Sequence, residues 1–432
     1  MAILNSLDSD FWEGRAVDTT VRNRALYLIP LFMIPAVSIF GHAIAPNQAV
    51  FKGQDWGILF SFALVAIAIL AWLFYSAKQP QWLRLQWGFL AVLFIAWFFQ
   101  TTSTQLDQSV FNLTAFIVPA ALIMVVLKRP DPSSLQLAFL CLLYSLILIS
   151  LASLVLGQLG LMPNGFDAVD SGGSRIPILS DLFGIENRWG GPFGSVNYAA
   201  PIGGLLFVSG LTLHSSHRIT IAASGIIVLG LSQGRTSTVA VLSAAVILVI
   251  YSRRFQQLHF RKAFQASVVF GVSLLVISYI VVFDITFAGR TPIWSDFFEL
   301  FQKNALWGVG SSGVRDYVDE RSEVPGLFVH DHAHNVPLDI AVRYGFVLLV
   351  LSLFLLIVVL LTTWQKRLQE NGASLAIAVY IIMAGMAETI FSWQYWGVYL
   401  VVLFYLAIDS GRNVKSDLDP SLTSTETASN LV

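Results

Sequence analysis

The chain has 432 residues, of which 56% are hydrophobic and only 12% are charged, and its mean hydropathy is +0.71. A soluble domain carries roughly a quarter of charged residues, so the polar side chains here are too few to cover a water-exposed surface. We therefore expect most of the surface to face membrane lipid. The formal net charge of -1 gives no basic footprint for nucleic acid, so we expect no nucleic-acid partner.

Two features concern the covalent chain and its start. The one cysteine, Cys141, excludes an intramolecular disulfide and lies in an apolar run, which predicts a packed thiol. Residues 1–24 mix acidic and basic side chains, and no small-residue cleavage site follows the first apolar stretch. We therefore interpret 1–24 as a cytoplasmic N-terminus and the first apolar stretch as a retained span.

Apolar segments of about the 20 residues that a membrane span needs recur along the chain. We predict an all-α, polytopic membrane protein of about twelve transmembrane helices, with residues 25–408 as one transmembrane domain. The predicted spans lie near 25–45, 56–76, 84–100, 109–127, 135–157, 196–213, 219–232, 236–252, 263–283, 336–363, 374–392 and 394–408. The seventh is short and a tight turn separates the last two, so eleven is the alternative. The polar residues 409–432 predict a disordered cytoplasmic tail.

Lys and Arg are concentrated in the segments that a cytoplasmic N-terminus places inside. The short outer loops hold only Lys52 and Arg235. The positive-inside rule therefore favours both chain ends in the cytoplasm. Two long segments, 158–195 and 284–335, then face outward, and long loops in a compact protein usually carry function. We expect the chemistry on the outer face.

Arg235 follows the short seventh span in the run Ser232-Gln233-Gly234-Arg235, and apolar helix resumes at once. One interpretation is an interfacial arginine that extends toward the lipid headgroups. The other is an anion ligand, because Thr236 or Ser237 can cap an outward-facing helix whose N–H groups then converge with the guanidinium. A guanidinium also binds phosphate in a bidentate fork that lysine lacks.

The run from Gly289 to Trp294 reads Gly-Arg-Thr-Pro-Ile-Trp, and its proline suits the first turn of a helix, so Arg290 is predicted at a second N-terminal helix end. Trp294, Phe297, Phe298 and Phe301 recur at helical spacing, which predicts an amphipathic helix in the outer interface. Trp294 is either a simple interfacial anchor or a weaker substrate contact. The glycine run 307–313 follows no strand and has no Walker lysine, so it predicts a tight turn rather than a phosphate loop.

The run from His330 to Pro337 holds three histidines at alternate positions together with Asp331. Such a set suggests a metal site, but no second ligand cluster supports it, and we expect no metal. The preferred interpretation uses the helix that starts here, with Asn335 as its cap. A helix N-terminus disfavours imidazolium, so His334 stays neutral and can act as a general base. Asp339 and Arg343 are four residues apart and are predicted to pair.

Three further polar residues are weaker candidates for substrate binding. Arg188 and Asn197 flank a turn rich in Gly and Pro that leads into the sixth predicted span, and they could contact sugar or phosphate. Glu388 lies inside the eleventh predicted span, and an acid within the membrane is a functional candidate. Its partner is not identifiable from the sequence.

Together these motifs resemble the bacterial O-antigen ligase and polymerase family. That family places a His-Asn pair nine residues before a glycine at the start of a late helix, and here His334-Asn335 is followed by Val336–Tyr344 and then Gly345. Where the family often has Gly, Thr or Tyr after two more residues, this chain has Leu348. The Gly-Arg-Thr-Pro-Ile-Trp, Trp-Gly-Val-Gly, Gln-Gly-Arg and Gly-Pro-Phe-Gly stretches also resemble family patterns, so the resemblance covers about 187–349.

The resemblance implies a GT-C-like membrane enzyme of the bacterial inner membrane whose site faces the periplasm. It implies an inverting glycosyl transfer from undecaprenyl diphosphate to an acceptor hydroxyl, with no cofactor. Arg235 and Arg290 would bind the diphosphate, and His334 would deprotonate the acceptor. The acceptor is lipid A–core in an O-antigen ligase of lipopolysaccharide biosynthesis, or a second lipid-linked glycan in a polymerase. An oligosaccharyltransferase acting on protein ranks third, and a polysaccharide flippase is the alternative from another class.

Overall fold

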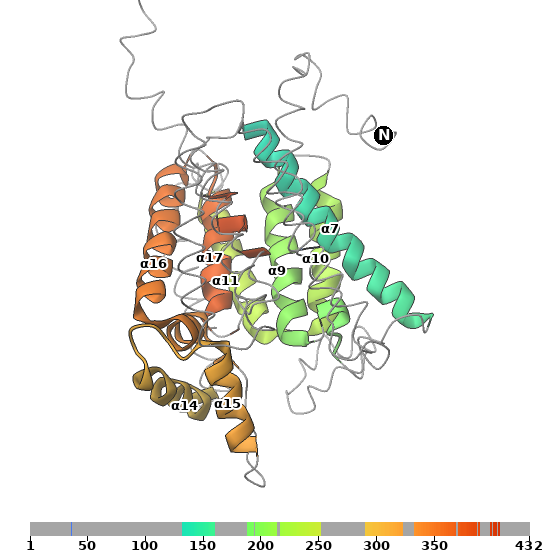
Figure 1. Cartoon of the computed structure of the whole chain (residues 1–432). Helices are drawn as coiled ribbons and strands as arrows, with labels where there is room; N and C mark the ends of the chain where they lie inside the picture. Colours follow the sequence, from blue (N-terminus) through green and yellow to red (C-terminus); the bar gives the residue numbers. More distant parts are fainter. Residues whose placement is uncertain are drawn as a thin grey trace, which may run out of the picture.

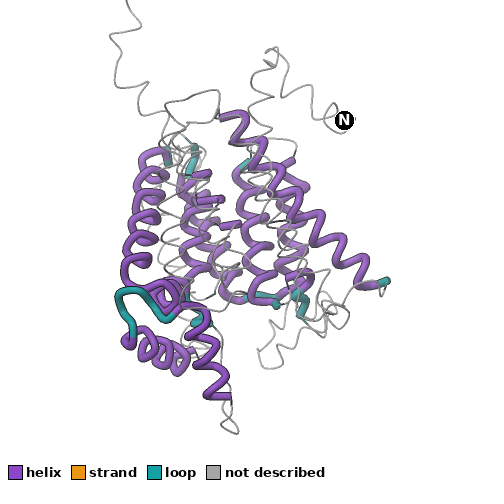
Figure 2. The backbone as a smooth tube through the Cα atoms, viewed as in Figure 1, coloured by secondary structure: helices purple, strands orange, loops and turns teal. Residues whose placement is uncertain are grey.

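The computed structural model describes residues 132–159, 188–193, 195–213, 217–251, 290–322, 332–368 and 370–386, together with Ala36, Glu388 and a few residues between 398 and 406. These residues form helices joined by loops and turns (Figure 2), which confirms the all-α prediction for the described part of the chain. The predicted cytoplasmic ends, 1–24 and 409–432, lie outside the described residues.

The helices agree closely with several of the predicted spans. They are α7 (Pro132–Gln158), η3 (Gly191–Phe193), α9 (Val196–Thr212), α10 (His217–Ser232), α11 (Arg235–Tyr251), α14 (Arg290–Lys303), α15 (Gly310–Ser322), α16 (Val336–Lys366) and α17 (Ala373–Gly385). Predicted spans near 135–157, 196–213, 219–232, 236–252 and 336–363 correspond to α7, α9, α10, α11 and α16. The spans near 25–45, 56–76, 84–100, 109–127, 263–283 and 394–408 lie wholly or largely outside the described residues.

Helices α9 and α10 form an antiparallel pair whose backbones touch. A Cβ atom at Gly203 would overlap the backbone nitrogen of Leu229, and one at Gly210 would overlap that of Ala222. Small residues at such positions let two apolar helices approach closely, as in membrane helix pairs. Helices α11 and α17 pack on α9 (Figure 1). The α17 contact includes a hydrogen bond at 2.6 Å that Tyr380 donates to the carbonyl oxygen of Pro201 in α9.

The helices place several chain segments at one end of the bundle. The rings of Tyr251 and Trp364 are 6.2 Å apart, so the C-terminal ends of α11 and α16 lie together. Both helices therefore begin at the other end of the bundle (Figure 1). That end, which we call the lower end after its place in Figure 1, holds the starts of α11 and α16, the end of α10 and the packed pair α14 and α15. The described residues of the two predicted outward-facing segments therefore lie at this end.

Helix α16 is interrupted at Gly345, whose φ of 79° and ψ of 179° are not helical. The turn that follows α14 is inserted at this break. The N–H of Val309 donates to the carbonyl of Val342 at 2.8 Å, and the N–H of Phe346 donates to the carbonyl of Ala305 at 2.8 Å. The sequence predicted a span over 336–363 and a turn near 307–313, but not the break at which the two join.

The insertion brings α14 and α15 against the first part of α16, where they form a small apolar core. Its buried members are Phe297, Leu300, Val314, Tyr317, Ala333 and Val342. Of the predicted aromatic stripe on α14, Phe297 is buried in this core and Phe301 packs against it, whereas Phe298 is 53% exposed. The amphipathic helix predicted here is thus present, and the part of its apolar face around Phe297 and Phe301 is covered by protein.

Two observations bear on the membrane. Among the described residues, one helix, Leu135–Gln158, is long and apolar enough to cross a membrane by length and composition. Helix α16 also carries a row of exposed apolar side chains after its break, formed by Phe346, Val350, Leu353, Phe354, Ile357, Leu361 and Trp364. These recur at helical spacing over about 27 Å, close to the thickness of a bilayer core. Such a face is typical of a helix in contact with lipid.

We predict that Gly345→Ala destabilises the protein by at least about 2 kcal/mol, because only glycine adopts this backbone conformation readily. The added Cβ would also overlap the carbonyl oxygen of Leu306. Thermal unfolding of the purified variant in detergent measures the effect. Phe346→Ala is the matched control, since Phe346 is 54% exposed and should change the unfolding temperature little. Equal unfolding temperatures for the two variants would contradict the insertion of the turn at the break.

Candidate active site

His334 lies in the loop directly before α16, in an uncommon backbone conformation. Its φ is 48°, in the left-handed region, and the residue is only 6% exposed. Such conformations cost about 1–3 kcal/mol and persist where the surroundings enforce them, often at functional sites. The loop is followed by the predicted cap: the side chain of Asn335 accepts the N–H of Leu338 at 3.0 Å. The helix start predicted from the sequence is thus confirmed.

Hydrogen bonds hold both the N–H and the carbonyl group of Ala333, the residue before His334. The N–H of Ala333 donates to Oδ1 of Asp339 at 3.3 Å, and its carbonyl accepts from Nε1 of Trp294 at 2.9 Å. Asp339 also forms the predicted ion pair with Arg343, at 3.1 Å between Oδ2 and Nε. The indole of Trp294 therefore does more than anchor α14 at an interface, because it connects α14 to the His334 loop.

The structure identifies the partners of Glu388, which the sequence alone did not identify. The predicted span 374–392 includes Glu388, but helix α17 ends at Gly385, so Glu388 lies in a bend after the helix. Its Oε1 accepts from Arg290 at 2.9 Å, and its Oε2 lies 3.7 Å from Nδ1 of His334. The second distance is too long for a hydrogen bond, and it becomes an ion pair only when the imidazole is protonated.

A further bond connects the His334 loop to the segment that carries Glu388. Nδ2 of Asn335 donates to the carbonyl of Met386 at 3.0 Å. Asn335 therefore uses its oxygen to cap α16 and its amide nitrogen to hold the end of α17. The residues before α16, the start of α14 and the segment after α17 meet at one buried position.

The electrostatic surroundings keep the imidazole of His334 neutral. Burial lowers the pKa of His334 below its ordinary value of 6.5, because the charged form loses hydration. The carboxylate of Glu388 opposes this effect, whereas the neighbouring His332 and the cation of Arg290 lower the pKa further. The lowered pKa favours the neutral imidazole, which is the form that a general base needs.

Arg235 is the first residue of α11, in the turn that joins α10 to α11 at the lower end. The prediction that Thr236 or Ser237 caps this helix is wrong, because the helix begins at Arg235 and both residues lie in its first turn. Gln233, which the sequence analysis did not single out, has a φ of 52° and is 1% exposed. Its side-chain amide has no hydrogen-bond partner among the described residues.

Arg188 and Asn197 lie beside this turn. Arg188 donates from Nε to the carbonyl of Ser232 at 3.2 Å and from a terminal nitrogen to that of Gln233 at 3.4 Å. These contacts satisfy carbonyl groups at the C-terminal end of α10. Asn197 is in the first turn of α9, and its backbone N–H donates to the capping side chain of Ser195 at 3.2 Å.

The eight predicted site residues therefore fall into two groups at the lower end. One group comprises Arg290, Trp294, His334, Asn335 and Glu388, which are connected by the contacts above, either directly or through the backbone of Ala333 and Met386. The other comprises Arg188, Asn197 and Arg235, around the starts of α9 and α11. The groups meet where the ring of Tyr198 faces that of His332, with centroids 6.3 Å apart.

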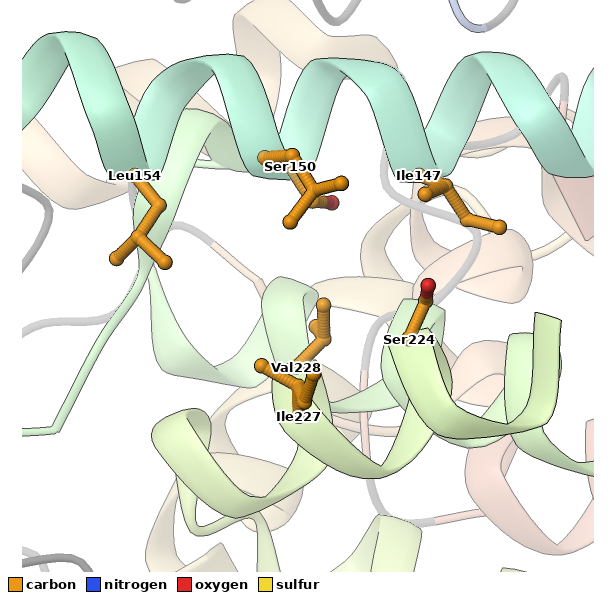
Figure 3. A pocket seen from close by; sticks show the side chains of 7 residues that line it. Ile147, Ser150, Leu154, Ser224, Ile227 and Val228 are labelled. Atoms are coloured by element: carbon orange, nitrogen blue, oxygen red, sulfur yellow. The ribbon is translucent and has the colours of Figure 1, made fainter. Parts of the chain in front are cut away.

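A separate groove lies between the middle parts of α7 and α10. It is lined by Ile147, Ser150, Leu151, Leu154, Ser224, Ile227 and Val228 (Figure 3). Apart from two hydroxyl groups, the lining is aliphatic and offers no charged or basic side chain. This groove therefore lacks the groups that acid–base chemistry needs, and the candidate active site is the cluster at the lower end.

Comparison with known proteins agrees with the sequence resemblance. The O-antigen ligase family model matches residues 220–353, which run from α10 through α11, α14 and α15 into α16 and include Arg235, Arg290 and His334. No curated protein matches the chain. Members of this family are polytopic inner-membrane proteins that transfer lipid-linked glycans. Residues 220–353 are thus similar to the O-antigen ligase family, whose members are membrane glycan transferases of the ligase and polymerase type.

Proposed function

We propose that the protein transfers a glycan from undecaprenyl diphosphate to an acceptor hydroxyl, with inversion, at the periplasmic face of the inner membrane. The observation that carries this proposal is the buried imidazole of His334 at 3.7 Å from a carboxylate that also binds Arg290. A base beside a cation suits a reaction in which a hydroxyl loses a proton while an anionic group leaves. The lower end of the bundle is then the periplasmic end.

The arginines have positions suited to the diphosphate of the donor. Arg235 is the first residue of α11 and Arg290 is the first residue of α14, two helices of 17 and 14 residues. The N–H groups at such helix ends attract anions, and a guanidinium binds phosphate oxygens in a bidentate fork. The two groups together would stabilise the negative charge that develops on the departing diphosphate.

His334 supplies the base in this proposal. The acceptor hydroxyl gives its proton to the imidazole while its oxygen attacks the anomeric carbon from the face opposite the diphosphate. The new carbon–oxygen bond forms as the bond to the diphosphate oxygen breaks, so the configuration inverts. The products are the glycosylated acceptor, undecaprenyl diphosphate and an imidazolium that later releases its proton to water. Only the groups of this chain and the two substrates take part.

The remaining predicted residues have supporting roles. Trp294 and Asn335 hold the His334 loop through Ala333 and Met386. Arg188 supports the turn before Arg235, since it binds the carbonyl groups of Ser232 and Gln233. Asn197, in the first turn of α9, would contact the sugar.

The acceptor is lipid A–core if the protein is an O-antigen ligase, which is the first assignment, and a second lipid-linked repeat if it is a polymerase. Leu348, where family members often carry Gly, Thr or Tyr, favours the polymerase alternative. Surface polysaccharide from a deletion strain separates the two. Loss of a ligase leaves long chains on the lipid carrier, whereas loss of a polymerase leaves single repeats on lipid A–core.

We predict that His334→Ala lowers transfer by about 10²- to 10⁴-fold, the usual contribution of a general base. The assay mixes purified protein, lipid-linked glycan and acceptor in detergent, where a flippase would make no product. His330→Ala and His332→Ala are the matched controls and should keep most of the activity. Equal losses in all three variants would contradict the base assignment and support the alternative of a histidine metal site.

We also predict that Arg235→Lys lowers kcat/KM for the donor by about tenfold or more, because a point charge loses the bidentate geometry. Arg218→Lys is the control, since Arg218 lies at the opposite end of α10, near its start, and is exposed. Steady-state kinetics at several ionic strengths measure both variants. Activity of Arg235→Lys equal to that of Arg218→Lys would contradict a role for Arg235 in binding the diphosphate.

A further inference from the structure

The carboxylate of Glu388 has a different partner on each oxygen. Oε1 is 2.9 Å from the guanidinium of Arg290, and Oε2 is 3.7 Å from Nδ1 of His334. The residue is 6% exposed, so water contributes little to the stabilisation of its charge. A buried carboxylate needs compensating charge or hydrogen bonds, and here the compensating groups are those to which the proposed function assigns chemistry.

We infer that Glu388 is a positioning residue for His334: its carboxylate orients the imidazole so that Nδ1–H faces Oε2 and Nε2 receives the proton of the acceptor hydroxyl. This inference rests on the proposed function. A carboxylate that holds a histidine in one tautomer and stabilises the resulting imidazolium is a recurring device in proton transfer. Such bonds are often long in the absence of substrate and shorten in the reactive complex, which accommodates the 3.7 Å distance.

Asn335 keeps Glu388 and His334 at a fixed separation. Its amide donates to the carbonyl of Met386, two residues before Glu388, while its own backbone follows His334 directly. One side chain therefore connects the two segments beside the pair. The asparagine of the His-Asn motif then has a task that a capping serine would not perform, since serine retains only the acceptor for the N–H of Leu338.

Arg290 balances the charge of Glu388 while His334 is neutral. Once the imidazole has taken a proton, the carboxylate gains a second cationic neighbour. The charged groups that face His334 are therefore Glu388 after α17 and Arg290 at the start of α14, with the His332 ring beside it in the same loop, at 4.2 Å between centroids. The arrangement stabilises the imidazolium at the moment when the acceptor attacks.

The test is Glu388→Gln in the full-length protein, with the same donor and acceptor in detergent. We expect kcat to fall at least about tenfold, because the neutral amide no longer selects the tautomer or stabilises the imidazolium. The KM for the donor should stay within about threefold, because both arginines proposed to bind the diphosphate are retained. The acid limb of the pH profile should move to lower pH, because the carboxylate that favours protonation of His334 has been removed. Glu388→Asp should restore part of kcat.

Two variants separate this role from a structural one. Glu370→Gln removes the carboxylate from another ion pair, with Lys366 at the opposite end of the bundle, and should leave kcat unchanged. Asn335→Ser keeps the cap but loses the bond to Met386, so it should lower kcat with little change in unfolding temperature. If Glu388→Gln does not fold, Asn335→Ser decides the matter in the same assay.

Wild-type kcat and an unshifted acid limb in Glu388→Gln would overturn the inference, and so would wild-type kcat in Asn335→Ser. Failure of the proposed function gives a different pattern. In that case the wild-type protein makes no product, or His334→Ala remains fully active.

Discussion

The arrangement of the site depends on one buried carboxylate. Glu388 follows α17, Arg290 begins α14 and His334 precedes α16. Nothing in the local sequence predicts that these three segments lie together. A carboxylate with 6% exposure is costly unless positive charge neutralises it, so the fold must bring a cation to that position. The Arg290 ion pair at 2.9 Å does this, and it thereby places α14 and the His334 loop around the same point.

The break in α16 makes that meeting possible. Nine residues, Val336–Tyr344, separate the cap at Asn335 from the non-helical Gly345, which corresponds to about 14 Å of helix. At one end of this short helix the cap holds the His334 loop, and at the other end the backbone of Ala305 and Val309 is inserted. The nine-residue spacing between the His-Asn pair and Gly345 thus fixes the distance between the two points at which this short helix is attached. A longer or shorter helix would separate α14 from the loop that carries His334.

Much of the local structure follows from the sequence because it depends on neighbouring residues. Apolar runs predicted α7, α9, α10, α11 and α16, and the cap at Asn335 and the start of α14 at Arg290 followed from Asn, Pro and helical spacing. The partners of Glu388 did not follow, since Arg290 lies 98 residues away and no periodic pattern reports such a contact. The insertion at Gly345 was missed for a related reason: a glycine in an apolar run is compatible with both a continuous and a broken helix. The end of α17 was placed too late because the apolar composition continues past the last helical residue.

The central claim is that the lower end of the bundle binds a polyprenyl diphosphate between the two arginines, within reach of His334. A cryo-electron microscopy structure of the protein in a lipid nanodisc with undecaprenyl diphosphate tests it most directly. The account predicts the diphosphate at the starts of α11 and α14, in contact with Arg235 and Arg290, with both guanidinium groups within about 10 Å of each other. A diphosphate bound at the opposite end of the bundle, near Lys366 and Arg367, or an Arg235 side chain directed only at lipid, would contradict it.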